Sequence, residues 1–267
     1  MKNIFLLLFV FKLLVPLAFS QDGDHIDGGR FSKNIEYNIL RPGIEFDTIK
    51  LEAAYNLNSK GDVEKLLFGD FNAPVEFFYE PTFEGASGFR IVRDKLKDSY
   101  FIEIKYVSNF EEARDEASKK YPMRGLSLYE MTSLSEEDHE RIRIQNSENM
   151  DKYFEERNNL FKIESRTFSI IDQFAEKMHE VMVSIIDNFK ARGVPPIIND
   201  GYSVTFRNVV DDEVWSLRIH IPQGRTLIFS DFCRKIIDET LITVQLDESK
   251  YIKSLNEFLL IYHLENK

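Results

Sequence analysis

His220 is the side chain whose type and surroundings most suggest chemistry. An imidazole beside carboxylates can bind a divalent metal ion or transfer protons. The hairpin predicted to carry His220 is bounded by loops that contain Asp200, Asp211 and Asp212. The sequence has no HExxH motif, no paired histidines at metal-ligand spacing and no nucleophile elbow. We therefore expect a solvent-facing histidine beside turn acids, and keep an active site around His220 as the alternative.

Cys233, the only cysteine, is the second candidate for chemistry. On a helical projection it lies beside Phe229, Phe232, Ile236 and Ile237, which is typical of a small core residue. No Cys-His signature surrounds it. We therefore expect a buried, inert thiol, and a chain without an internal disulfide bond.

Loops that bind phosphate or metal are not recognisable either. Gly61-Asp62 and residues 85–88 lack the Lys-Ser/Thr pair or the βαβ context that cradles phosphate. The Asp- and Gly-rich residues 22–29 do not place oxygen ligands at the EF-hand positions. His139 and His179 lie among charged residues and are expected at the surface. The sequence predicts no cofactor and no metal site, and it leaves the catalytic residues unknown.

Residues 1–20 have the pattern of a secretory signal peptide. A lysine precedes an apolar run, and Ala-Phe-Ser at residues 18–20 is a small-x-small cleavage site. We expect export to the periplasm or the exterior with cleavage near Ser20-Gln21; an uncleaved membrane anchor is the alternative. No later stretch approaches the roughly 20 apolar residues of a spanning helix, so no membrane span is expected in the mature chain.

The charge balance excludes some classes of partner. The chain carries a formal charge of −11, and loss of the two lysines in residues 1–20 would bring the mature chain to −13. A nucleic-acid backbone or an anionic lipid surface requires a cationic face, so neither is an expected partner. With 43% hydrophobic residues, the chain can build a core without disulfide bonds.

Residues 167–221 form the clearest structural unit. Apolar residues recur every three or four positions along its first part, which predicts one buried helical face. These residues are Ile171, Phe174, Met178, Val181, Met182, Ile185 and Phe189. Ser169 and Asp172 have the spacing of a capping box at the helix start. A hairpin follows from Gly201, and its second strand turns Trp215, Leu217 and Ile219 inward, opposite His220.

The other elements alternate between strands and amphipathic helices. Strands are predicted at residues 35–40, 75–79, 88–93, 100–107 and 160–168, and helices at residues 48–57, 63–68, 109–120, 225–242 and 247–264. Phe77-Phe78-Tyr79 must point aromatic rings to both faces of its strand, one of which is either covered by a helix or a contact surface. The predicted fold class is α+β, an antiparallel sheet of hairpins with amphipathic helices packed on one face.

The predicted domain organisation has three parts: a signal peptide at residues 1–20, a loosely ordered segment at 21–47 and an α+β domain at 48–267. Within that domain, residues 62–122 and 160–267 are candidate halves joined by the polar segment 133–159. Each half contains a hairpin followed by a helix. Two explanations stay open: a duplicated hairpin-helix unit, or the alternation that every amphipathic hairpin must show.

A signal peptide followed by Gln21, a Gly-Val-Pro-Pro corner at residues 193–196 and a Val-Trp-Ser-Leu strand at residues 214–217 occur together in this chain. In these features it resembles exported proteins of unassigned function from gut bacteria. The resemblance covers mainly the C-terminal half and implies no activity.

Two functions are compatible with the sequence. We expect a non-enzymatic exported module that binds another protein or an envelope component, because catalytic signatures are missing and the chain is acidic. The alternative is a hydrolase whose site is assembled from distant residues around His220 and nearby acids. A deep polar pocket that joins His220 to two or more acids would favour the hydrolase, whereas a shallow face with exposed aromatic side chains would favour the binding module.

Overall fold

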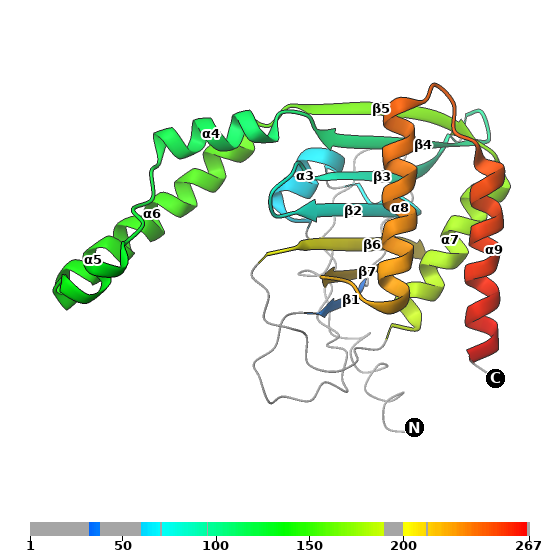
Figure 1. Cartoon of the computed structure of the whole chain (residues 1–267). Coiled ribbons are helices and arrows are strands. Elements are labelled where there is room, and N and C mark those ends of the chain that lie inside the picture. The colour runs from blue at the N-terminus through cyan, green and yellow to red at the C-terminus, as the bar shows by residue number, and fades with distance from the viewer. Residues whose placement is uncertain are drawn as a thin grey trace, which may run out of the picture.

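The computed structural model describes residues 32–37, 60–69, 71–94, 96–189, 200–211 and 213–265. It confirms the predicted α+β class: in these ranges helices lie on both faces of a seven-stranded sheet, and a helical arm projects from it (Figure 1). The predicted signal segment, the predicted helix at residues 48–57 and the corner at residues 193–196 lie outside the described residues. Within the described ranges, no helix combines the length and the apolar character needed to cross a membrane.

Seven strands and seven helices lie in the described ranges. The strands are β1 (Ser32–Tyr37), β2 (Val75–Pro81), β3 (Ser87–Asp94), β4 (Ser99–Val107), β5 (Ile163–Ile170), β6 (Tyr202–Val210) and β7 (Glu213–His220). The helices are α3 (Asp62–Phe68), α4 (Phe110–Lys120), α5 (Leu128–Ser133), α6 (Glu136–Leu160), α7 (Asp172–Asp187), α8 (Gly224–Ile242) and α9 (Glu248–Glu265). The predicted elements that fall in these ranges are present, with their ends shifted by a few residues.

The strand order is β1-β7-β6-β2-β3-β4-β5, and all neighbours are antiparallel except β1 and β7. The strand β2 therefore joins two hairpins, because it pairs with β3 of the β3–β4 hairpin and with β6 of the β6–β7 hairpin. The sequence predicts antiparallel pairing throughout. The parallel strand β1 departs from it because the alternation of a single strand does not encode the direction of its partner.

One face of the sheet is covered by α7, α8 and α9, which form the main core with it (Figure 1). Phe174 and Met178 of α7 are fully buried there, as the helical periodicity predicts. Cys233 of α8 is also fully buried, which confirms the predicted core thiol, and burial raises the pKa of that thiol well above its usual value. Leu217 is buried as predicted, but Trp215 is only partly buried and packs at the margin of the core.

The start of α7 differs from the prediction. Ser169 belongs to β5, so it cannot cap the helix, and Ile171 occupies the cap position with 51% of its surface exposed. The expected burial of Ile171 is therefore wrong. Its backbone N–H instead donates to Oε2 of Glu248 at 2.9 Å, which ties the start of α7 to the start of α9.

The short helix α3 covers the opposite face, so the helices are not confined to one face as predicted. Leu67 and Phe68 of α3 form a second core with Phe78, the middle residue of the Phe-Phe-Tyr run. Gly88 makes this contact possible, because a Cβ atom at that position would lie 2.9 Å from the ring of Phe68 and 2.5 Å from the carbonyl oxygen of Phe77.

The helices α4, α5 and α6 form an arm that leaves the sheet between β4 and β5 (Figure 1). The polar segment 133–159 lies mostly in α6, whose 25 residues give a length of about 37 Å. Ala113 and Ala117 of α4 are buried, so α4 and α6 approach closely along small side chains. After the β3–β4 hairpin the chain continues into the arm with α4. After the β6–β7 hairpin it continues into α8, which packs on the sheet.

Truncation at two neighbouring positions of α7 tests this account of the main core. We expect Phe174→Ala to lower the free energy of unfolding by about 3–5 kcal/mol, because it leaves a cavity in a packed core. The matched change Ile171→Ala should cost about 0.5 kcal/mol or less, because that side chain is half exposed and its N–H is retained. Chemical denaturation of both variants measures the difference, and equal midpoints would contradict the observed helix start.

Candidate functional site

The second face of the sheet carries a row of polar side chains. Ser216, Arg207, Glu76, Arg90 and Glu103 stand opposite one another on the consecutive strands β7, β6, β2, β3 and β4. Side chains alternate along a strand, so all five point away from the main core. Glu76 and Arg207 are nevertheless buried, because α3 lies over them. The row therefore places charges of both signs in the protein interior.

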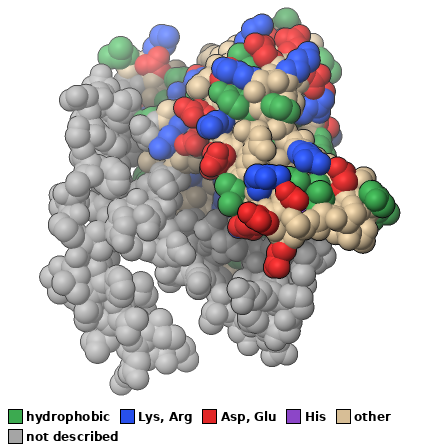
Figure 2. All heavy atoms as spheres, turned by 90° about the vertical axis from the view of Figure 1, so that its left-hand side faces the viewer, with side chains coloured by type: hydrophobic (Ala, Val, Ile, Leu, Met, Phe, Trp, Pro, Cys, Tyr) green, Lys and Arg blue, Asp and Glu red, His purple; other side chains and the backbone are tan. Residues whose placement is uncertain are grey.

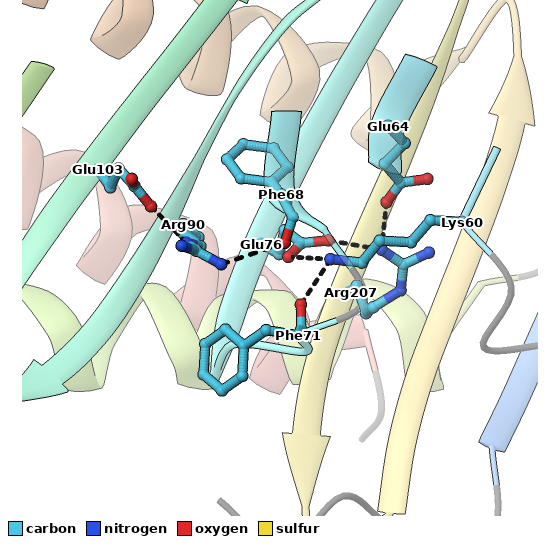
Figure 3. A network of polar contacts seen from close by, with 8 residues as sticks. All are labelled: Lys60, Glu64, Phe68, Phe71, Glu76, Arg90, Glu103 and Arg207. Atoms are coloured by element: carbon cyan, nitrogen blue, oxygen red, sulfur yellow. Dashed lines mark hydrogen bonds and ion pairs between the residues drawn. The ribbon is translucent and has the colours of Figure 1, made fainter. Parts of the chain in front are cut away.

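Four charged side chains at the centre of this face form a network (Figure 3). Lys60 Nζ lies 2.8 Å from Glu76 Oε2 and donates to the carbonyl oxygen of Phe71 at 2.6 Å. Arg207 Nη1 lies 2.5 Å from Glu76 Oε1 and also pairs with Glu64 of α3. None of the four charged side chains is more than 2% exposed. Two cations balance two anions, which is the condition under which charges are tolerated in an interior.

The pKa values of the network follow from burial and from the opposite charges. Burial lowers the pKa of Lys60 and raises that of Glu64. Burial also acts to raise the pKa of Glu76, but the adjacent Lys60 and Arg207 outweigh it, so that pKa is lowered. Because all four groups are shielded from solvent, we assign them to holding α3 on the sheet.

Arg90 extends the network toward the sheet edge. Its Nε lies 2.5 Å from Glu103 Oε2, and its Nη1 donates to the carbonyl oxygen of Phe68 at 3.3 Å (Figure 3). Its guanidinium also lies over the rings of Phe68 and Phe71, with centroid distances of 5.7 and 5.2 Å. The C-terminal end of α3 is therefore held to β3 by a charge as well as by apolar packing.

A cleft of about 330 Å³ lies where this face of the sheet meets the base of the arm. We call it the junction pocket. Its polar side is formed by Glu80, Thr82, Glu84, Tyr202, Ser203, Arg218 and His220, and the other side by Val63, Pro81, Ala86, Phe110, Phe154, Arg157 and Phe161. The strand residues lie at one edge of the sheet, where the C-terminal ends of β2 and β7 meet the N-terminal end of β6. Phe110, Phe154 and Phe161 belong to the base of the arm.

His220 is half-buried in the junction pocket, which corrects the prediction of a solvent-facing side chain. Its Nδ1 lies 3.2 Å from the hydroxyl oxygen of Ser203, its register partner on β6. The prediction is wrong because α3 and the arm base flank the ends of these strands, and neither is apparent from the alternation within β7.

The acids that accompany His220 are not those expected from the sequence. Asp211 is exposed in the turn at the other end of β7, Asp200 is exposed before β6, and Asp212 lies outside the described residues. The junction pocket instead brings Glu80 and Glu84 to the histidine. Glu80 shares the face of Glu76 and Phe78 along β2, but only the β2–β6 pairing, which the sequence does not reveal, places it beside β6 and β7.

The chemistry available in the junction pocket is proton transfer or hydrogen bonding. The Ser203–His220 contact joins a hydroxyl to an imidazole, while Glu80 Oε2 accepts from Arg218 Nη2 at 2.8 Å. Among the described residues, no three His, Cys, Asp or Glu side chains are grouped so that they could hold a metal ion.

The other two histidines predicted at the surface are half-buried. His179 Nε2 donates to the carbonyl oxygen of Val209 at 2.8 Å, which links α7 to the end of β6. His139 lines a groove on the arm. Neither lies in the junction pocket.

The outer end of the arm carries three exposed apolar residues of α5, Leu128, Tyr129 and Met131, which we call the arm tip. The arm tip is beyond the reach of α4, since α5 lies at the far end of the arm (Figure 1). Figure 2, which views the molecule from the arm side, shows hydrophobic side chains interspersed with acidic and basic ones on that face.

No family model, curated protein or solved structure matches the chain. The resemblance to exported gut-bacterial proteins therefore stays a prediction.

Removal of one charge tests the role of the buried network. We expect Arg207→Met to lower the free energy of unfolding by about 3–5 kcal/mol, because two buried carboxylates then share one cation. The double variant Arg207→Met, Glu64→Met should recover part of this loss, because it leaves the balanced Lys60–Glu76 pair.

The matched control is Arg218→Met on the same sheet face, whose pair with Glu80 is about one third exposed. It should cost about 1 kcal/mol or less, the usual range for solvent-accessible pairs. Urea titration measures all three variants. If the double variant is no more stable than Arg207→Met, uncompensated charge is not the cause of the loss.

Proposed function

We propose that the chain is an exported, non-enzymatic module that binds a partner protein through the arm tip. The observation that carries the proposal is the exposure of Leu128, Tyr129 and Met131, which are 82%, 78% and 54% exposed on one short helix. Grouped exposed apolar residues mark interaction sites, whereas single ones are normal. The signal-peptide pattern of residues 1–20 supports the exported location.

Side chain–backbone hydrogen bonds stabilise the arm, which has no large apolar core among its described residues. Asn109 at its base donates to the carbonyl oxygen of Leu160 at 2.9 Å and accepts from the N–H of Lys162 at 2.7 Å. Farther out, Asn146 of α6 makes two 2.8 Å bonds to the backbone of Arg124 in the segment that leads to α5. Such side chain–backbone bonds replace the apolar contacts that a two-helix hairpin lacks, so the tip is held at a defined distance from the sheet.

The start of α5 is equally well defined. Ser127 and Glu130 form a capping box, and the bonds from the N–H and hydroxyl of Ser127, with Arg124 nearby, lower the pKa of Glu130 to about 2. The helix that carries the tip is thus fixed at its N-terminus. A preformed apolar surface loses less conformational entropy on binding than a flexible one.

The charges beside the tip indicate the chemistry of the partner. A groove of about 880 Å³ between the first turns of α6 and the segment that leads into α5 is lined in part by Glu136 and Glu137. Within the described part of the chain these two glutamates form no ion pair, whereas Glu140 pairs with Arg143 and Glu130 with Arg124. The partner surface that fits is an apolar recess bordered by Lys or Arg side chains.

An affinity experiment with tip variants tests this proposal. Tagged chain that begins at Gln21 is incubated with envelope fractions, and the proteins retained are compared with those retained by Leu128→Ser/Tyr129→Ser. We expect the double variant to lose the partner, because the apolar anchors are removed. The control Leu96→Ser changes a leucine that is 97% exposed in the β3–β4 turn, and it should retain the partner.

The same experiment at increasing salt checks the charge complementarity. Retention should weaken between low and physiological ionic strength, and Glu136→Gln/Glu137→Gln should reduce that dependence. Retention of the same proteins by wild type and by Leu128→Ser/Tyr129→Ser would contradict the proposal. Tip-dependent dimerisation in light scattering would instead assign the tip to a second copy, and tip-dependent sedimentation with lipid vesicles would assign it to a membrane; either result overturns the protein partner.

A second candidate function is the hydrolase, favoured by the contact between Ser203 and His220 in a pocket that also contains Glu80 and Glu84. In that case the serine hydroxyl is the nucleophile and the imidazole its base. Against it, the carboxylate of Glu80 is bonded to Arg218, so it does not orient the imidazole.

Ester hydrolysis distinguishes this second candidate. If Ser203 is a nucleophile, Ser203→Ala should abolish hydrolysis of a short-chain chromogenic ester, with a loss of about a hundredfold or more. Ser165→Ala, an exposed serine of β5 on the same sheet, should leave the rate unchanged. No hydrolysis above the buffer rate, or the same rate in both variants, would exclude the hydrolase.

A further inference from the structure

Arg157 of α6 lines the junction pocket without a protein counter-ion in the described ranges. No carboxylate there lies within 4.0 Å of its guanidinium nitrogens, and its hydrogen bond from Nη2 goes to the neutral Oδ1 of Asn158 at 3.1 Å. Its Nε is buried and has no acceptor among the described residues. A guanidinium carries five N–H donors, and leaving them unsatisfied in a partly buried site is costly.

Aromatic rings hold this guanidinium where an acid would ordinarily do so. The ring centroids of Phe154, Phe161, Phe110 and Tyr153 lie 4.9, 5.3, 5.9 and 5.9 Å from its Cζ atom. Cation–π contacts fix the position of the arginine but do not neutralise its charge. The pocket therefore presents a positioned, partly desolvated cation, which is the arrangement that strengthens pairing with an incoming anion.

The other charges of the pocket limit the anion to one negative charge. Arg218 is already neutralised by Glu80 at 2.8 Å, and Glu84 adds a carboxylate at the exposed rim. A dianion such as phosphate would meet these two glutamates with only one uncompensated cation in the described lining. A monoanion matches the single charge of Arg157.

The rest of the lining determines the body of the ligand. Val63, Ala86, Phe110 and Phe161 provide an apolar wall. The volume of about 330 Å³ is at the lower limit of ligand pockets, so it suits a molecule the size of a single amino acid.

We propose that the junction pocket binds a small organic monocarboxylate, whose carboxylate pairs with Arg157 and whose apolar body packs against the apolar wall. This site lies at the opposite end of α6 from the arm tip. It stands independently of the proposed partner binding and of any reaction at Ser203.

Calorimetric titration of the full mature chain tests the site, with phenylacetate as the probe. Benzylamine has a similar ring and the opposite charge, and inorganic phosphate has the charge without the apolar body. We expect wild type to bind phenylacetate, and to bind the other two at least about tenfold more weakly.

Two substitutions of opposite effect test the residue assignment. Arg157→Gln should weaken phenylacetate binding at least about tenfold, because the pairing charge is lost. Glu84→Gln should strengthen it by about twofold to threefold, because a like charge is removed from the rim. The control Arg143→Gln changes an exposed arginine of the same helix, already paired with Glu140, and should leave affinity unchanged.

Arg157→Gln removes the pairing charge and also disturbs the aromatic packing at the base of the arm. Glu84→Gln separates these two effects, because Glu84 is exposed and its replacement leaves the packing intact. Tighter binding by Glu84→Gln together with weaker binding by Arg157→Gln supports the site. The proposal is overturned if wild type does not bind phenylacetate at millimolar concentration, if Arg157→Gln binds it as well as wild type does, if Glu84→Gln fails to strengthen binding, or if benzylamine or phosphate binds equally well.

Discussion

The pairing of Arg207 with Glu64 and Glu76 is the interaction on which the second face of the sheet depends. A seven-residue helix such as α3 is too short to persist by itself in water, so its position must come from tertiary contacts. The buried charges supply a directional contact, and the packing of Phe68 over Gly88 supplies an apolar one. With α3 in place, Val63 becomes one wall of the junction pocket. The candidate site on this face thus depends on a charge balance rather than on hydrophobic area alone.

The main core was predictable from sequence because it follows two simple periodicities. Phe174 and Met178 recur at helical spacing, and Leu217 alternates with its neighbours, so their burial requires no knowledge of the partner element. The junction pocket could not be predicted in the same way. Its members come from three strands, α3, the β2–β3 loop and the arm, and the strand residues meet only through the pairing of β2 with β6, which joins residues as distant as Val75 and Asn208. Arg157, in turn, gives the same signal in the sequence as any arginine on a polar helix.

The helix α6 connects two surfaces of different character. Its first turns follow directly after the tip helix α5 and carry Glu136 and Glu137. Its last turns lie against the sheet, where Arg157 is surrounded by aromatic rings. The sequence of α6 has little apolar periodicity, and only Ile142 and Tyr153 are buried. The helix therefore faces solvent over most of its length. Capping and ion pairs along the surface therefore contribute much of what keeps it helical.

The strand order also constrains how the chain can fold. The hairpins β3–β4 and β6–β7 involve residues close in sequence, so each can form early, whereas β2 must wait for β6 across the whole arm and α7. Among the described strands, β1 comes first along the chain but pairs with β7, the last strand to be made. A chain that emerges from its N-terminus would therefore hold β1 without its partner until every other described strand of the sheet had been synthesised. During that interval β1 is exposed to whatever else can pair with an extended strand, and assembly of this edge of the sheet is necessarily among the last events of folding.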